Sequence, residues 1–176
     1  MITRAPTQED QPWLLEFLAA VPDSDRNFFR ESVSDPDIVR RWFDDPPAIH
    51  LVAVDDGGRV CGHAEVRRRT GWSAHVGEIA VIVRPEHRGR GVGGSLTRAA
   101  LLDAVAGGMT RIVVEVVAEQ VPTVEMFKAL GFEPEALLRG FVRDQAGQEH
   151  DLMVLTHRVE ELWADMRGLG IMDEAL

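Results

Sequence analysis

The sequence has 176 residues, 45% of them hydrophobic and 27% charged, which is the ordinary composition of one soluble globular domain. A formal net charge of −10 argues against nucleic acid as a partner, because binding to phosphate backbones needs clustered lysine and arginine. The single cysteine, Cys61, excludes an intrachain disulfide, and no apolar run approaches the roughly 18 residues of a membrane helix. The N-terminus lacks a signal-peptide pattern, so we expect a cytoplasmic protein with no membrane partner.

Basic residues gather in one part of this acidic chain. Between Arg84 and Arg98 there are four arginines and one glutamate, a net charge of +3, so the rest of the chain carries −13. Such a basic segment could bind an anionic ligand while the acidic surroundings attract a cationic one. Solubility alone is also a sufficient reason for the overall acidity.

The first 47 residues are expected to be largely helical. A short edge strand at residues 1–4 precedes a helix over 12–20, where apolar side chains recur at helical spacing. A second helical stretch follows, with a break at Asp35-Pro36 and an end at residues 44–47. It contains four large aromatic residues, most of which we expect in the core: Phe28, Phe29, Trp42 and Phe43.

From Ala48 the pattern changes to strands with helices inserted between them. Strands over 49–54 and 59–69 flank Asp55-Asp56-Gly57-Gly58, which is a hairpin signal. The elements expected after them are a strand over 76–83, a helix over 91–106, a strand over 111–117, a helix over 122–130, strands over 136–143 and 149–155, and an amphipathic helix over 158–167. This order predicts an α+β fold with a mixed central sheet of six to seven strands and helices on both faces.

The chain is organised around the apolar strand 76–83, a basic turn and the glycine-rich start of the long helix. Glycines allow a tight turn and a close approach of the backbone to a ligand, and a helix N-terminus presents unpaired N–H groups. Four glycines fall among the six residues 89–94, more than a turn alone requires. The segment therefore predicts a cradle for an anion such as a phosphate ester.

Residues 89–94 also match the dinucleotide-binding pattern G-x-G-x-x-G. In that fold the first glycine follows its strand almost directly, whereas five residues separate Val83 from Gly89 here, and too few βαβ units follow. A phosphate loop of the G-x-x-x-x-G-K-[ST] type is excluded, because no Gly-Lys-Ser/Thr closes the motif.

The pattern Arg88-x-x-Gly91-x-Gly93, preceded by Val83-x-Pro85, resembles the acyl-CoA pyrophosphate loop of the GNAT N-acetyltransferase superfamily. The similarity extends over about residues 49–155 and is strongest in 81–96 and in 113–132, which ends in Ala-Leu-Gly-Phe. The resemblance implies a single N-acetyltransferase domain over 1–176. Within it, residues 1–47 would lie on the acceptor side, 48–157 would form the core with the CoA site, and 158–176 would form a C-terminal helix and tail.

The resemblance further implies acetyl-CoA as cosubstrate, without a metal. Backbone N–H groups of residues 88–93 would hold the pyrophosphate, and the strand residues 81–83 would pair with the pantetheine amides like an added strand. The residues implied to bind the cofactor are Val81, Ile82, Val83, Arg88, Gly89, Arg90, Gly91, Val92, Gly93, Gly94, Gln120 and Phe127.

Glu78 is similar in placement to the glutamate that acts as general base in that superfamily. A charged side chain within an apolar strand costs free energy unless it is paired or solvated in a cleft. A cleft could raise its pKa towards a useful value. The alternative is a structural salt bridge with Arg67 or Arg68 on the neighbouring strand.

The expected general acid is where the chain departs from the superfamily. Many members carry a tyrosine four residues before the closing Gly-Phe, placed to protonate the departing sulfur. Phe127 occupies that position, and the chain contains no tyrosine. Gln120 stands where asparagine usually opens the same helix. The thiolate could leave unassisted or take its proton from water or another side chain, or turnover could be slow or lost.

The acceptor pocket is expected between the N-terminal helices and the last strands. We predict Phe28, Phe29 and Glu115 as acceptor-binding residues, with Trp42 and Phe43 as further determinants of specificity. His63, His75 and His150 lack the spacing of a metal site, and Cys61 needs no role beyond packing.

The sequence thus predicts an acetyl-CoA-dependent N-acetyltransferase acting on an amine of a small molecule or of a protein lysine. The second hypothesis is an acyl-CoA-binding sensor or assembly domain without turnover. Nucleotide-dependent redox chemistry is a third. The final strands or the C-terminal helix would mediate a homodimer if one forms.

Overall fold

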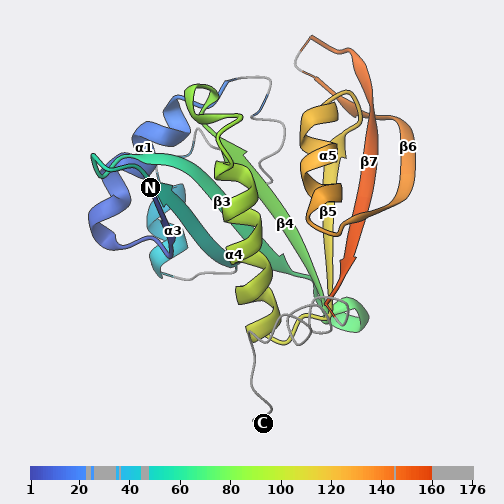
Figure 1. The fold of residues 1–176 in the computed structure, drawn as a ribbon, viewed down its shortest axis with the longest axis horizontal. Helices are drawn as coiled ribbons and strands as arrows, with labels where there is room; N and C mark the ends of the chain where they lie inside the picture. The colour runs from blue at the N-terminus through green and yellow to red at the C-terminus, as the bar shows by residue number, and fades with distance from the viewer. Residues whose placement is uncertain (23–24, 26–34, 36, 45–47, 145, 160–176) are drawn as a thin grey trace.

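The computed structural model describes residues 1–22, 25, 35, 37–44, 48–144 and 146–159. Its centre is a seven-stranded sheet in the order β1-β2-β3-β4-β5-β7-β6. All neighbouring strands are antiparallel except β4 and β5, which run parallel. The predicted α+β class and mixed sheet are therefore confirmed (Figure 1).

The sheet and its helices follow the predicted order along the chain. The strands are β1 (Ile2–Arg4), β2 (Ala48–Val54), β3 (Val60–Arg68), β4 (Val76–Val83), β5 (Arg111–Val117), β6 (Glu133–Arg143) and β7 (Glu149–Arg158). The helices are α1 (Gln11–Ala19), α3 (Ile38–Asp44), α4 (Val92–Ala106) and α5 (Val121–Ala129), with 3-10 turns η1 (Gln8–Asp10), η2 (Gly71–Ser73) and η3 (Pro85–His87).

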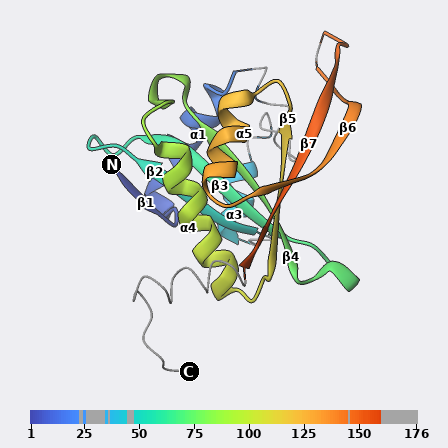
Figure 2. The same cartoon turned by 45° about the vertical axis from the view of Figure 1, so that its right-hand side comes forward.

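Helices cover both faces of the sheet, because strand side chains alternate between two apolar clusters. On one face, α4 packs its buried Leu96 and Ala100 against Ala64, Ile79 and residues of β5. On the other, Leu14 of α1 and Trp42 of α3 pack against Val52 and Ile82. Figure 2 shows α4 and α5 in front of the strands, with α1 and α3 behind them.

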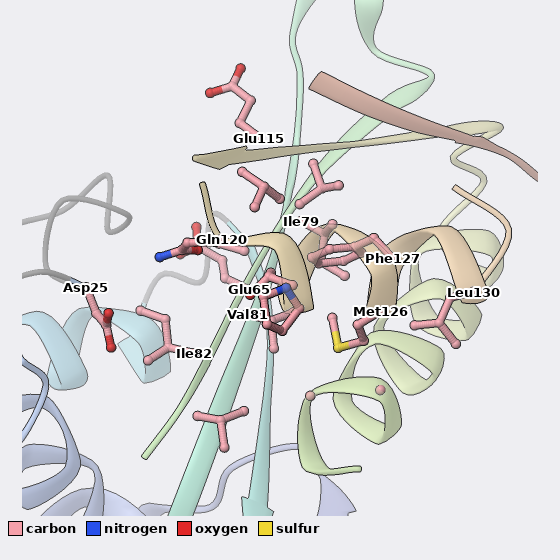
Figure 3. Close-up of a pocket in the computed structure, with 18 of the residues that line it drawn as sticks. Asp25, Glu65, Ile79, Val81, Ile82, Glu115, Gln120, Met126, Phe127 and Leu130 are labelled. Atoms are coloured by element: carbon pink, nitrogen blue, oxygen red, sulfur yellow. The ribbon is translucent and has the colours of Figure 1, made fainter. Parts of the chain in front are cut away.

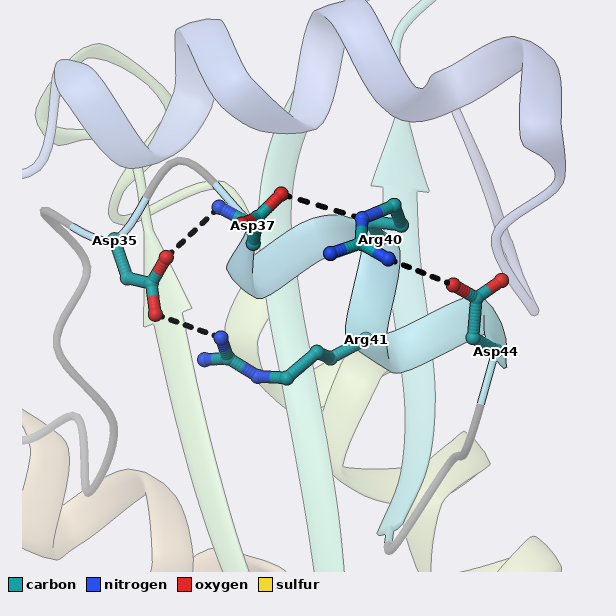
Figure 4. Close-up of polar contacts among 5 residues, drawn as sticks. All are labelled: Asp35, Asp37, Arg40, Arg41 and Asp44. Atoms are coloured by element: carbon teal, nitrogen blue, oxygen red, sulfur yellow. Dashed lines mark hydrogen bonds and ion pairs between the residues drawn. The ribbon is translucent and has the colours of Figure 1, made fainter.

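The short helix α3 is held by charged contacts along its exposed side (Figure 4). Asp35 accepts a hydrogen bond from the Asp37 N–H at 2.8 Å and pairs with Arg41 at 2.6 Å. Arg40 contacts Asp37 and Asp44 at 3.2 and 3.5 Å. Exposed pairs of this kind each contribute about 0.3–0.5 kcal/mol, so α3 depends chiefly on its buried side chains.

The C-terminal part differs from the prediction in two places. β6 begins at Glu133 instead of residue 136. Its register with β7 is irregular between Pro134 and Ala136. β7 continues to Arg158, which pairs with Arg111, and Val159 after it is helical, so the predicted helix begins one residue later than expected. Residues 160–167 of that helix lie outside the described residues. Within the described part, no helix has the length and apolar character needed to cross a bilayer.

Candidate active site

The glycine turn between β4 and α4 has the backbone that its sequence predicts. Gly89 and Gly91 adopt φ values of +70° and +80°, in the left-handed region that side chains other than glycine rarely enter. A Cβ at either position would have no atom within 4 Å, so the turn faces open space. Gly91 is the N-cap residue of α4, and the N–H groups of the first helical turn follow it.

The two parallel strands β4 and β5 separate beside this turn. They pair from Val76 with Arg111 to Ile79 with Val114 and no further. Val81, Ile82 and Val83 therefore keep their partners on β3 but present their other backbone edge to the space between the diverging strands. An extended chain carrying amides could add to such an edge as a strand does.

A cleft of about 1110 Å³ occupies this space. Its walls include every predicted cofactor residue except Arg90, which is exposed on the turn and does not border the cleft. Figure 3 shows Met126 and Phe127 of α5, and Leu130 just after it, on one side and Asp25 on the opposite side. Phe127 is buried and lies edge-on to Phe132, with ring centroids 5.1 Å apart. The α5 wall is thus apolar, apart from Gln120 and Thr123.

Arg88 anchors the turn through its side chain. Its Nε donates to the Val83 carbonyl at 2.9 Å, and its Nη2 pairs with the buried carboxylate of Asp25. No pattern in the sequence links Asp25 to Arg88, which lies 63 positions away. Because the Arg88 guanidinium is engaged in these contacts, Arg88 offers an anion mainly its backbone N–H group.

Glu78 lines the cleft on the face of the sheet that lies opposite α4. Strand register places it beside Arg67 of β3 and Val113 of β5, and its side chain is 15% exposed. Its carboxylate pairs with Arg69, which directly follows β3, so a salt bridge with an arginine of the neighbouring strand region is present. Arg67 pairs with Glu65 at 2.6 Å. The structure thus provides an ion pair for Glu78 and also exposes it to the cleft.

Glu115 also borders the cleft, from the exposed side of β5. It lies two residues beyond Val113, the residue opposite Glu78, so both carboxylates lie on the same face of the sheet. Phe28 and Phe29, the other predicted acceptor residues, lie outside the described residues. Three or more potential metal ligands are grouped nowhere in the part of the chain that the structure describes.

A stack of three rings beside the cleft was not predicted. Trp42 of α3 lies against His50 and His63, with ring centroids 4.5 and 4.6 Å away, and the two imidazoles are hydrogen-bonded at 3.1 Å. Burial, and secondarily the neighbouring His50, holds the pKa of His63 well below its usual range, so His63 is neutral at physiological pH. Of the three rings, only His63 borders the cleft.

The comparison with known proteins decides the family. The sequence matches the acetyltransferase (GNAT) family over residues 16–132, more than half of the chain. The chain belongs to the acetyltransferase (GNAT) family. The GNAT resemblance of the glycine turn and of the 113–132 segment is thereby confirmed.

The GNAT relatives with curated names are mycothiol acetyltransferases. The chain is 32% identical over 132 residues to that of Arthrobacter sp. (strain FB24), and 34% identical over 134 residues to that of Pseudarthrobacter chlorophenolicus. Each match covers 72% of this chain but only 40% of the relative. The chain therefore spans less than half the length of these relatives.

Solved GNAT structures share the fold. The ribosomal-protein-alanine N-acetyltransferase of Brucella melitensis superposes with a TM-score of 0.78 at 22% identity, covering 90% of this chain and 99% of its own. A phosphinothricin acetyltransferase from Sinorhizobium meliloti, solved in complex with acetyl-CoA, superposes with a TM-score of 0.76 at 19% identity. The superposition covers 89% of this chain and 87% of that chain. At these identities the likeness concerns the fold alone.

Proposed function

We propose that this GNAT protein is an acetyl-CoA-dependent N-acetyltransferase that moves an acetyl group to an amine by direct attack in a ternary complex. The observation that carries the proposal is the glycine turn at the open end of two diverging strands. An anion at the turn would meet backbone N–H groups and the positive end of the α4 dipole. An extended pantetheine arm would lie along residues 81–83, which leads its thioester towards Phe127.

Glu78 is our candidate for the general base. It borders the cleft, and the face on which it lies is the one from which an acceptor can approach the thioester. An ammonium acceptor would transfer one proton to Glu78, and the freed nitrogen lone pair would attack the thioester carbonyl carbon. As the C–N bond forms, the C–S bond breaks and the sulfur leaves as thiolate. The nitrogen loses a second proton to solvent or to that thiolate, and the amide product keeps the third.

Departure of the thiolate is the step with the least help from this chain. Phe127 offers no proton, and the sequence contains no tyrosine. A thiol with a pKa of about 8.5 can leave as an anion near neutral pH, so turnover does not require an acid. The lack of an acid is nevertheless what favours the second candidate function, an acyl-CoA-binding domain without turnover.

Acetyl-CoA binding and amine-dependent thiol release separate these candidates. We expect acetyl-CoA to raise the melting temperature and at least one amine to release CoA thiol. A mycothiol-type acceptor heads the amine panel because of the curated relatives, followed by polyamines and a lysine peptide. A melting shift without thiol release from any amine would support the sensor. A shift with a nicotinamide dinucleotide and none with CoA would contradict both. The cytoplasmic location and the homodimer stay predictions.

A further inference from the structure

The four arginines of the basic segment 84–98 fall into two classes. Arg84 and Arg88 each pair with a carboxylate from the N-terminal part of the chain. Arg90 and Arg98 are exposed, and neither forms a hydrogen bond or an ion pair with another residue in the described part of the chain. Of these two, only Arg98 borders the large cleft. Arg98 is thus a cation that faces the cleft and has no described partner.

The Arg98 side chain lies over the first turn of α4. Helical side chains lean towards the N-terminus of their helix, and residues four apart share a face. A Cβ built on Gly94 would lie 3.7 Å from Nη1 of Arg98. Gly93 and Gly94 border the cleft together with Arg98. The guanidinium is therefore close to the turn whose N–H groups we assign to the diphosphate.

This position is unfavourable for a cation when no anion is bound. The N-terminal end of a helix carries the positive end of the helix dipole, and acidic side chains are the usual compensation there. The first turn of α4 contains no acidic residue, and no described carboxylate pairs with Arg98. An anion bound outside this turn would meet both the dipole and the guanidinium.

The chemistry of CoA indicates which anion that is. The diphosphate joins the pantetheine arm to a ribose that carries the adenine and a 3′-phosphate. If the arm follows residues 81–83, the ribose leaves the turn on its other side, between α4 and α5. The two helices meet there, because Sδ of Met126 would lie 3.0 Å from a Cβ on Gly93. Met126 and Leu130 line this part of the cleft with apolar surface, and Arg98 adds a charge.

We propose that Arg98 binds the 3′-phosphate of CoA and makes the protein prefer CoA to dephospho-CoA. The proposal rests on the proposed function, because it assigns a second phosphate of the same cofactor. A phosphate monoester carries a charge of about −1.5 to −2 near pH 7, and a guanidinium binds it through paired N–H donors. The backbone N–H groups would hold the diphosphate, which both nucleotides contain, so the Arg98 contact is what distinguishes them.

The first test compares the affinities of CoA and dephospho-CoA by isothermal titration. We expect the wild type to bind CoA about 10-fold more tightly, the usual effect of one hydrogen-bonded charge. Arg98→Gln removes the charge and keeps a good helix former, so the fold should persist. In this variant the affinity for CoA should fall to that for dephospho-CoA, which should itself stay unchanged.

Arg139→Gln is the matched control. Arg139 is also exposed and without a described partner, but it lies on β6 and does not border the cleft. This variant should keep the wild-type preference for CoA. Equal affinities of the wild type for the two nucleotides would overturn the role of Arg98, and so would an equal loss in Arg98→Gln and Arg139→Gln. A loss in Arg98→Gln that affects both nucleotides alike would also overturn it.

The second test separates KM from kcat with acetyl-CoA and acetyl-dephospho-CoA as cosubstrates. The 3′-phosphate lies at the opposite end of the cofactor from the thioester. We therefore expect a KM about 10-fold higher for acetyl-dephospho-CoA, a similar kcat, and equal KM values in Arg98→Gln. A difference confined to kcat would overturn the proposal and leave the transferase intact. An Arg98-dependent preference in binding without turnover of any amine would support the phosphate site and contradict the transferase.

Discussion

The two ends of β4 present different kinds of group to a ligand. At its C-terminal end, Gly89, Gly91 and the start of α4 present backbone N–H groups, and the guanidinium of Arg88 is already engaged in other contacts. At its N-terminal end, Glu78 and Arg69 present side chains that are held in an ion pair. A site built from backbone keeps its specificity when the surrounding side chains change, whereas a site built from side chains can take a new acceptor after a few substitutions. Under the proposed function, the first end would hold the cofactor and the second the acceptor.

Glu78→Gln should have the largest effect, because it removes the proposed base and leaves the glycine turn untouched. We expect kcat to fall by about 10²- to 10⁴-fold, the usual contribution of general base catalysis. The dissociation constant of acetyl-CoA should change little, as isothermal titration would show. The control is Glu149→Gln, since Glu149 forms an exposed ion pair with Arg143 on β6. A kcat that survives in Glu78→Gln would leave Glu78 as the partner of Arg69 only.

Arg88→Gln tests how the turn is anchored. The substitution leaves the buried Asp25 carboxylate without this partner, which should lower the free energy of unfolding by about 1–3 kcal/mol. In an Asp25→Asn background the same change should cost less, since the uncompensated charge is gone. Chemical denaturation of the four proteins gives the coupling energy. Purely additive effects would show that the ion pair does not hold the turn.

Gly91→Ala tests whether the glycine turn binds the cofactor, and alanine at Gly58 is the control that introduces a similar backbone strain away from the cleft. Gly58 has a φ of +82° in the β2–β3 hairpin and, like Gly91, open space where a Cβ would lie. Alanine at either position should cost about 1–2 kcal/mol of left-handed strain. Only Gly91→Ala should also weaken acetyl-CoA binding, by about 10-fold if that strain displaces the turn. Equal affinities in the two variants would mean that the cofactor does not contact this turn.

The buried His63 should have a smaller effect, on how the stability of the folded protein depends on pH. Its pKa lies well below 6.5 in the folded protein, so the unfolded chain binds a proton first as pH falls. Its contribution to stability is complete above pH about 6.5 and declines by up to about 1.4 kcal/mol per pH unit below that value. His63→Phe keeps a ring against Trp42 and should flatten the dependence between pH 6.5 and 5. An unchanged slope would assign the dependence to His50 or to other groups.

The part of this site that the sequence predicts is the part that depends on local backbone. Glycines that need positive φ, an apolar strand before them and a long helix after them are all adjacent in the chain, so one stretch carries the whole signal. The order of the seven strands along the chain could be predicted, because the intervening helices are clear in the sequence pattern. The start of β6 at Glu133 escaped prediction, because an exposed strand with an irregular register leaves no alternation to detect.

Side-chain partners depend on register and on elements far apart in the sequence. Glu78 pairs with Arg69, beyond the end of β3, and Arg67 pairs with Glu65 two residues away on the same strand. The stack of Trp42 on His50 and His63 requires α3 to cross two strands, and no spacing in the sequence encodes that crossing. The same holds for Asp25 and Arg88, which are in contact although 63 positions separate them in the sequence.

A crystal structure with acetyl-CoA tests the central assignment most directly. We predict the diphosphate within hydrogen-bonding distance of the N–H groups between Gly89 and Gly94, with the thioester between β4 and β5 near Phe127. A diphosphate bound beside Arg69 instead, at the opposite end of β4, would contradict the account.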